Sequence, residues 1–370
     1  MKLSKYIAGI NGLRAIAAIA VLLSHVTGNW GVFKLGWIGV DLFFVISGFL
    51  ITKILVENRN AKNYFKAFYS RRAIRILPIY FIVVFPLVAF HLWRNIVPVY
   101  VPLSYFVYFQ NSFSMNYGWL QGLGHTWTLA IEEQFYIFFP LALYFVKRKY
   151  LLFFFVSAIA LIVGLRFYFY FEHYSAYYVS IFTIARMDGF FIGGLIALIG
   201  SIPFRLSFKS WNLIFNSTSI FSLFSLSLLM LYFGNRADGI WNKFFLGFDN
   251  FKAVSNYLSS LGHLKYTLLS LLFAAILGKV VYQTSSFSEK LVAWLERPFL
   301  RKLGEMSYGI YLYHYVYVSF FRYTFQLNEA DILPRILMIL FIIAATYFTA
   351  LLSFKYIETP FFRLRRSYEY

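Results

Sequence analysis

Long apolar stretches separated by short polar segments run through the whole chain. Ten of these stretches approach the roughly 20 residues that a helix needs to cross the hydrocarbon layer of a membrane. They lie near residues 10–27, 36–56, 77–93, 126–146, 150–171, 178–200, 212–233, 261–283, 305–324 and 333–354. An eleventh stretch, 99–113, is shorter and contains Pro102, Gln110 and Asn111. The pattern predicts an all-α polytopic membrane protein with about ten transmembrane helices.

The positions of the positive charges predict how these helices are oriented. Ten helices with a cytoplasmic N-terminus place most of the 34 Lys and Arg residues in cytoplasmic segments, as the positive-inside rule requires. If 99–113 also crossed the membrane, the basic cluster Lys147–Lys149 would lie outside and every later loop would change side. We therefore expect both termini to be cytoplasmic. Segment 99–113 is expected to be an interfacial or re-entrant piece on the outer side, buried in protein.

The composition agrees with a membrane protein and excludes several functions. Of the 370 residues, 60% are hydrophobic and only 13% are charged, which is too few charges for the surface of a soluble protein. Cys is absent, which excludes disulfides, thiolate metal sites and a Cys nucleophile, and no metal is expected. We attribute the net charge of +19 to loops that meet anionic membrane lipids, and not to nucleic-acid binding. One membrane domain over residues 1–370 is expected, with no appended soluble domain and no cleaved signal peptide.

Two ionisable residues in the first apolar stretch, Arg14 and His25, are the first candidates for function. They stand 11 residues apart, about three helical turns, so they share one face and are separated by roughly 16 Å along the helix axis. An ionisable residue inside a membrane helix is costly and indicates function by default. In the predicted topology, His25 lies in the outer half of the membrane. Asp41 and Glu132 lie at a similar depth, with Glu133 beside Glu132.

A His held by a carboxylate is the usual arrangement of a general base. The carboxylate fixes the tautomer and stabilises the imidazolium that forms when the His takes a hydroxyl proton. Asp41 or Glu132 is therefore expected to orient His25. The alternative is that His25 is only a hydrogen-bonding residue within the bundle.

A second group of charges lies on the predicted cytoplasmic side, in the segment YSRRAIRILPIY. Arg71, Arg72 and Arg75 are close neighbours on a helix at this spacing. Because guanidinium groups bind phosphates with two parallel hydrogen bonds, the cluster could receive an anionic cofactor such as a nucleotide or coenzyme A. The alternative is a topology anchor that only touches lipid headgroups. Glu358, at a similar depth, is expected to form an ion pair with one of these arginines.

Further polar residues lie deeper in the predicted helices. Arg186 and Asp188 are two residues apart and therefore do not face each other, so each is expected to need a partner on another helix. His314 lies in the middle of its stretch and is as consistent with a structural role as with a catalytic one. Three glycines after Arg186 are expected to let another helix approach closely: Gly189, Gly193 and Gly194.

Six sequence blocks resemble, in order, the motifs of the integral-membrane acyltransferase family 3. The first block is NGLRAIAAIAVLLSH, including its spacing of 11 between Arg14 and His25. The others are GWIGVDLFFVISGFLIT, FYSRRAIRILPIYF, HTWTLAIEEQFYIFFP, LGEMSYGIYLYH and YIETPFF. Together they cover most of the chain, although the middle helices resemble the family mainly around Arg186.

The resemblance implies a ten-helix enzyme of the bacterial cytoplasmic membrane. Such an enzyme moves an acyl group, often acetyl, from cytoplasmic acyl-coenzyme A to an extracytoplasmic hydroxyl, often on a cell-envelope or exported glycan. His25 matches the family's catalytic His, with Arg14 as its partner and Glu132 as the Glu of the fourth block. The family's RxxR element, which is associated with the acyl donor, matches Arg72 and Arg75, and Arg71 extends it.

The sequence departs from the family pattern at two positions. Thr128 stands where Ser is commoner, and Asn11 stands where many members have Asp, so Arg14 lacks a possible counter-charge. Many relatives carry a soluble esterase-like domain that would relay the acyl group. Without one in this chain, we expect either direct acylation or a separate partner protein. A transporter or flippase for a lipid-linked or anionic glycan is the alternative function, although the sequence shows no inverted repeat.

Overall fold

The computed structural model describes residues 6–28, 31–95, 97–201, 207–234, 259–325, 331–364, 367–368 and 370. Within these residues all regular structure is helical, and there is no β-strand. The longer helices are α1 (Ile10–Thr27), α2 (Gly39–Glu57), α3 (Tyr64–Arg94), α6 (Trp127–Phe145), α7 (Leu151–Phe171), α10 (Asp188–Ser201), α11 (Phe208–Gly234), α13 (Ser259–Tyr282), α16 (Ser307–Phe325) and α17 (Ile332–Ser353). The shorter helices are α4 (Tyr100–Leu103), α5 (Gln110–Tyr117), α8 (Ala176–Ile181), α9 (Thr183–Arg186), α14 (Ser286–Leu295), α15 (Pro298–Glu305) and α18 (Thr359–Leu364).

The predicted apolar stretches coincide with these helices. Among the described residues, six helical segments are long and apolar enough to cross a membrane, which indicates a multi-pass membrane protein. Each of the ten predicted stretches falls mainly on one helix, except that 178–200 is divided among α8, α9 and α10. The all-α class is confirmed. The number ten and the cytoplasmic position of both termini stay predictions.

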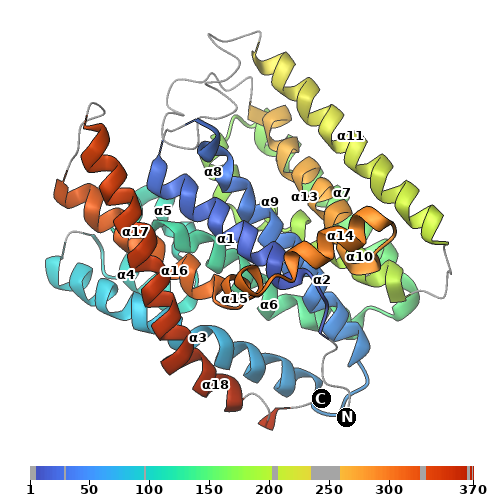
Figure 1. The fold of residues 1–370 in the computed structure, drawn as a ribbon, viewed down its shortest axis with the longest axis horizontal. Coiled ribbons are helices and arrows are strands. Elements are labelled where there is room, and N and C mark those ends of the chain that lie inside the picture. The colour runs from blue at the N-terminus through green and yellow to red at the C-terminus, as the bar shows by residue number, and fades with distance from the viewer. Residues whose placement is uncertain are drawn as a thin grey trace.

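Helices α1 and α2 lie near the middle of the view in Figure 1, and most of the apolar window of each is buried. Helix α1 packs against α2, α15 and α16, and α2 packs against α10 and α13. Helix α11 lies at the edge, where it packs on α13 and exposes large apolar side chains such as Leu213 and Phe221, as a lipid-facing helix does. Arg14 of α1 and Asp41 of α2 therefore lie among other helices.

Helix α3 is longer than the apolar stretch that predicts it. Its 31 residues span about 46 Å, against roughly 30 Å for the hydrocarbon layer. The helix begins at Tyr64, well before the predicted start at residue 77. The segment with Arg71, Arg72 and Arg75 is thus helical, as the spacing of the three arginines predicts.

Segment 99–113 does not form one long helix. It folds into α4, a 3-10 turn at Ser104–Val107, and the start of α5. The side chains of Ser104, Gln110 and Asn111 are buried within the protein. Short helical pieces whose polar side chains are buried suit an interfacial or re-entrant segment, because protein groups must satisfy its backbone.

The helix predicted over 178–200 is interrupted, and polar side chains from other helices satisfy the carbonyls at the interruption. Asn111 Nδ2 of α5 donates a hydrogen bond to Ile181 O at 3.1 Å. Arg166 Nε of α7 donates to Ala185 O at 2.7 Å. Non-helical backbone inside a membrane protein is stable only with such partners. The interruption places Arg186 at the end of α9 and Asp188 at the start of α10.

Helices α2 and α10 cross in direct backbone contact through two glycines. A Cβ added at Gly48 would lie 2.0 Å from Phe190 O, and a Cβ added at Gly193 would lie 2.0 Å from Val45 O. Only Gly permits such a crossing. The close approach predicted at Gly193 is therefore confirmed, and it fixes α2, which carries Asp41, against α10.

We expect Gly193→Val to lower the stability of the protein by about 3 kcal/mol, because the two helix backbones would have to separate. Thermal unfolding in detergent and the yield of monodisperse protein measure the effect. Gly164→Val is the matched control, since a Cβ at Gly164 meets no atom within 4 Å. Equal stability of the two variants would contradict the assigned crossing.

Candidate active site

A cavity lies inside the bundle, lined by α1, α2, α3, α6 and α16. It encloses about 70 Å³ of space open to the centres of water molecules. One water needs about 10–15 Å³ by this measure, so the cavity has room for several waters or for a group the size of acetyl. Its charged side chains are Arg14, Arg72, Arg75, Glu132 and Glu133.

The carboxylate of Glu132 lies among the arginines of this cavity. It accepts a hydrogen bond from Ser47 Oγ at 3.2 Å. The opposite charges that act on it are those of Arg72, Arg14 and Arg75. Three guanidinium groups and two carboxylates give the cavity an excess of positive charge when all are ionised, which suits an anionic ligand.

The three arginines near the start of α3, Arg71, Arg72 and Arg75, do not act as one cluster. Arg72 and Arg75, one helical turn apart, both line the cavity, and the Arg72 guanidinium lies 4.9 Å from the centroid of the Tyr136 ring. Arg71 lies instead over the ring of Tyr370, at 5.7 Å from its centroid. The candidate anion site therefore contains Arg72 and Arg75, and Arg71 is placed outside the cavity lining.

Glu358 lies beside the same arginines, at the end of a short π-helical segment that follows α17. Its side chain is buried, and the opposite charges that act on it are those of Arg75 and Arg14. Its Oε1 also lies close to Gly309 of α16. Glu358 therefore lies near two of the cavity arginines, and its predicted ion pair with one of them stays a prediction.

Three histidines form a second polar centre. His25 Nδ1 of α1 and His314 Nε2 of α16 are 2.8 Å apart, and their rings stack with centroids 5.0 Å apart. His125, in the 3-10 turn Gly124–Thr126, lies edge-to-face with His314 at 5.2 Å. His125 and His314 are buried, whereas His25 is only half-buried. Of the three rings, His25 is the one that a substrate can reach most readily.

Tyr311 and Thr128 lie between the cavity and the histidines. Both line the cavity, and their hydroxyl oxygens are 2.6 Å apart. Tyr311 Oη also donates to His125 O at 3.0 Å. The two polar centres are therefore separate but share a wall that is one layer of side chains thick.

The expected pairing of His25 with a carboxylate is wrong. Asp41 Oδ1 accepts a hydrogen bond from Arg186 Nη2 at 2.8 Å, and Glu132 lies among the cavity arginines. A carboxylate in a low-dielectric interior gains more from a guanidinium than from a neutral imidazole. His314 occupies the position beside His25 that was expected for Asp41 or Glu132.

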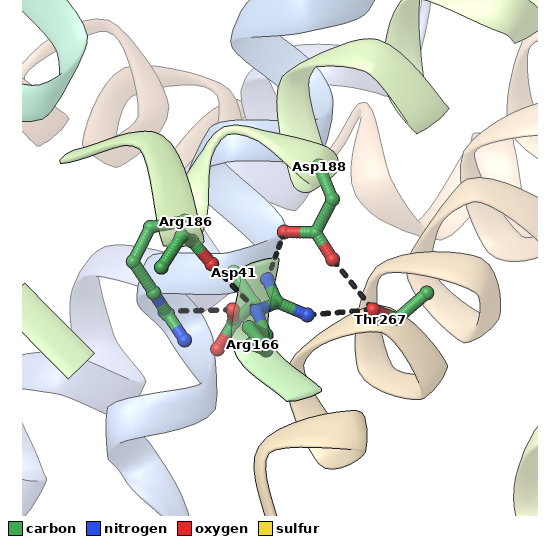
Figure 2. A network of polar contacts seen from close by, with 6 residues as sticks. Asp41, Arg166, Arg186, Asp188 and Thr267 are labelled. Carbon is green, nitrogen blue, oxygen red and sulfur yellow. Dashed lines mark hydrogen bonds and ion pairs between the residues drawn. The ribbon is translucent and has the colours of Figure 1, made fainter. Parts of the chain in front are cut away.

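The Asp41–Arg186 ion pair belongs to a larger buried network, shown in Figure 2. Arg166 Nη2 donates to Asp188 Oδ1 at 2.5 Å, and Thr267 Oγ1 donates to Asp188 Oδ2 at 2.7 Å. The charged side chains of both pairs are at most 3% exposed. As predicted, Arg186 and Asp188 each have a partner on another helix, so the network joins α2, α7, α9, α10 and α13.

A comparison with known protein families gives a match over nearly the whole chain. A family described as the acyltransferase domain matches residues 7–354. This range includes both polar centres and the buried network, and it excludes only Glu358 among the predicted site residues. The chain belongs to this family.

The acyltransferase domain also has relatives among curated proteins. It is 30% identical over 393 residues to the peptidoglycan O-acetyltransferase OatA of Listeria monocytogenes serovar 1/2a, an alignment that covers 96% of this chain and 56% of the relative. It is 29% identical over 378 residues to the O-acetyltransferase OatA of Staphylococcus aureus strain NCTC 8325, covering 96% of this chain and 57% of the relative. The chain thus spans just over half the length of these relatives. No solved structure matches it.

Three residues of this acyltransferase domain were not among the predicted site residues. Arg166 lies inside a predicted apolar stretch and could have been found by the same rule that singles out Arg14. His125 precedes the predicted helix 126–146, and its position gives no sign that it reaches His314. Tyr311 is one of 30 tyrosines, and its place between the two centres is visible only in three dimensions.

Proposed function

We propose that this chain is a membrane O-acyltransferase that moves an acyl group, most simply acetyl, from acyl-coenzyme A to a hydroxyl of an extracytoplasmic glycan. The observation that carries the proposal is the arrangement of the two polar centres. Arginines that suit an anionic donor line a cavity on one side of Tyr311 and Thr128, and an accessible His lies on the other side. The names of the two relatives support acetyl as the group and a hydroxyl as the acceptor.

The donor would bind with its phosphates at the inner end of α3. Arg72 and Arg75 would hold phosphate oxygens, and Arg14 would lie nearer the thioester. The acyl group and the end of the pantetheine arm would lie in the cavity. The nucleotide would lie outside it, toward the side that the charge distribution predicts to be cytoplasmic.

His25 would act as the general base. Its free ring nitrogen takes the proton of the acceptor hydroxyl, and the hydroxyl oxygen attacks the thioester carbonyl. The carbon–sulfur bond breaks, and the thiolate takes the proton back from His25 and leaves as free coenzyme A. The donor's acyl group and His25 can meet only when Tyr311 or Thr128 moves aside.

Peptidoglycan is the first acceptor to test, because the Listeria relative carries it in its name. The purified protein is placed in liposomes with radiolabelled acetyl-coenzyme A and soluble muramyl glycan fragments. We expect alkali-labile label on the glycan, as an ester. An intact thioester with folded protein and excess acceptor would overturn the proposal, and movement of unmodified glycan across the bilayer would favour a transporter or flippase.

A double replacement, Arg72→Ala with Arg75→Ala, is expected to raise the KM for acetyl-coenzyme A by roughly 100-fold. Each lost guanidinium–phosphate contact costs about 1.5–3 kcal/mol, discounted here for partial exposure. Arg71→Ala is the matched control, because Arg71 lies over Tyr370 and outside the cavity lining. An unchanged KM in the double variant would show that Arg72 and Arg75 do not bind the donor and would favour the alternative role of a topology anchor.

A further inference from the structure

The hydrogen bonds of His314 define a direction for the pair that it forms with His25. His314 Nδ1 lies 3.2 Å from Ile310 O, one helical turn back along α16. A carbonyl oxygen only accepts hydrogen bonds, so His314 Nδ1 carries a hydrogen. In a neutral imidazole the other nitrogen is then a bare acceptor. His314 Nε2 is therefore able to accept a hydrogen bond from His25 Nδ1, at the observed 2.8 Å.

The surroundings favour a neutral His314. Its side chain is fully buried at 0% exposure, and an unpaired buried cation is strongly disfavoured. The groups that face the pair are the rings of His125, Tyr311 and Tyr315, and Arg322, whose Nη2 donates to His25 O at 2.8 Å. Among the described residues, no carboxylate forms a hydrogen bond or ion pair with either ring. With His314 neutral, His25 carries its hydrogen on Nδ1 and leaves Nε2 bare.

We propose that His314 is the positioning residue of the general base, and that it replaces the carboxylate that usually performs this task. It holds His25 in the tautomer whose Nε2 is free to accept a proton, and its own Nε2 accepts a hydrogen bond from the imidazolium that results. This inference rests on the proposed function, because it assigns His25 the role of base.

The proton movements balance along the pair. When His25 Nε2 takes the hydroxyl proton, the His25 ring becomes cationic while its Nδ1 hydrogen still points at His314 Nε2. That hydrogen stays on His25 Nδ1, because a charge on the fully buried His314 ring is disfavoured. The starting tautomers are restored when the thiolate takes the proton from His25 Nε2 and leaves. The His25–His314 pair is neutral before and after the reaction. A pair made of a buried carboxylate and a neutral His would carry a net negative charge. A neutral resting state suits a site that lies inside a membrane and next to Arg322.

The first experiment determines the tautomer without any activity. The protein contains 6 His residues, so nitrogen-15 NMR of protein labelled only at His is tractable, and a His25→Asn variant assigns the His25 signals. We expect hydrogen on His25 Nδ1 and a bare Nε2 in the wild type. In His314→Leu we expect the commoner Nε2-protonated form of His25. A wild type with hydrogen on His25 Nε2 would overturn the inference.

The second experiment separates positioning from a merely structural role. In His314→Leu we expect kcat to fall about 100-fold while KM for the donor stays within about twofold. His314→Gln, which can place an acceptor oxygen near the position of Nε2, should recover at least one tenth of wild-type kcat. Equal activity of the Leu and Gln variants, or a change confined to KM, would overturn the inference.

The outcomes distinguish the inference from the proposed function. If wild-type protein transfers no acyl group but shows the predicted His25 tautomer, the proposed function fails and the hydrogen-bond assignment stands. If wild type is active and His314→Leu is equally active, this inference alone fails. Thermal unfolding of each variant shows whether the fold is intact before its kinetics are compared.

Discussion

Replacement of His25 by Ala is expected to lower kcat for acyl transfer by at least about 10³-fold. A positioned general base contributes roughly 10²–10⁴ in rate, and no other ring in the histidine cluster is as exposed. The measurement is label transfer from acetyl-coenzyme A to the glycan under saturating donor. His173→Asn is the control, because His173 is exposed and its φ of 58° is one that Asn tolerates.

The same variant should bind the donor as wild type does. The arginines of the cavity lie on the far side of Tyr311 and Thr128, so loss of the imidazole leaves them in place. Equilibrium binding of acetyl-coenzyme A to His25→Ala measures this directly. Transfer at the wild-type rate would exclude His25 as the base, and loss of donor binding would show that the two centres are not independent.

Replacement of Asp188 by Leu is expected to destabilise the folded bundle by about 3–5 kcal/mol. The change leaves Arg166 charged, buried and without its carboxylate. Removal of one partner of a buried ion pair typically lowers the free energy of unfolding by about this amount. Thr267 Oγ1 loses its acceptor as well. Thermal unfolding in detergent or nanodiscs should show a Tm lowered by several degrees or a failure to assemble.

Two further variants make this prediction specific. The double variant Arg166→Met with Asp188→Leu should lose less stability than the sum of the losses in the two single variants. No unpaired charge of this ion pair remains in the double variant. Glu57→Gln is the exposed control: Glu57 pairs with Lys53 near the end of α2, where an exposed pair contributes at most about 1 kcal/mol. Additive losses in the double variant would show that the Arg166–Asp188 contact is not coupled.

The fold could be predicted from the sequence where one rule dominates. Spans follow from the length of apolar runs, and the close approach at Gly193 follows from the absence of a side chain. The interruption between α8 and α10 could not be predicted, because the groups that make it tolerable, Asn111 and Arg166, come from distant segments. The early start of α3 was missed for a simpler reason, since hydropathy marks the apolar part of a helix and not its polar end.

The site was predicted at the level of residue types and not of pairs. The sequence indicates which side chains are too polar for a membrane, and Arg14, His25 and Glu132 were found in this way. It does not indicate which of them are in contact. The depth of a residue in the membrane can be estimated from the sequence, but the neighbouring helix that its side chain faces cannot. The carboxylates lie beside guanidinium groups, and the partner of His25 is the neutral ring of His314. Competition among buried charges decided the pairing, and that competition depends on the whole bundle.

The wall formed by Tyr311 and Thr128 has an electrical consequence. A continuous chain of arginines, carboxylates and histidines across a membrane would conduct protons and would dissipate the membrane potential. Here such a chain is interrupted by two hydroxyls that bond to each other and to the backbone of His125. In the proposed reaction, a passage that opens only while an acyl group fills it would let acyl transfer cross the bilayer while the membrane stays insulating.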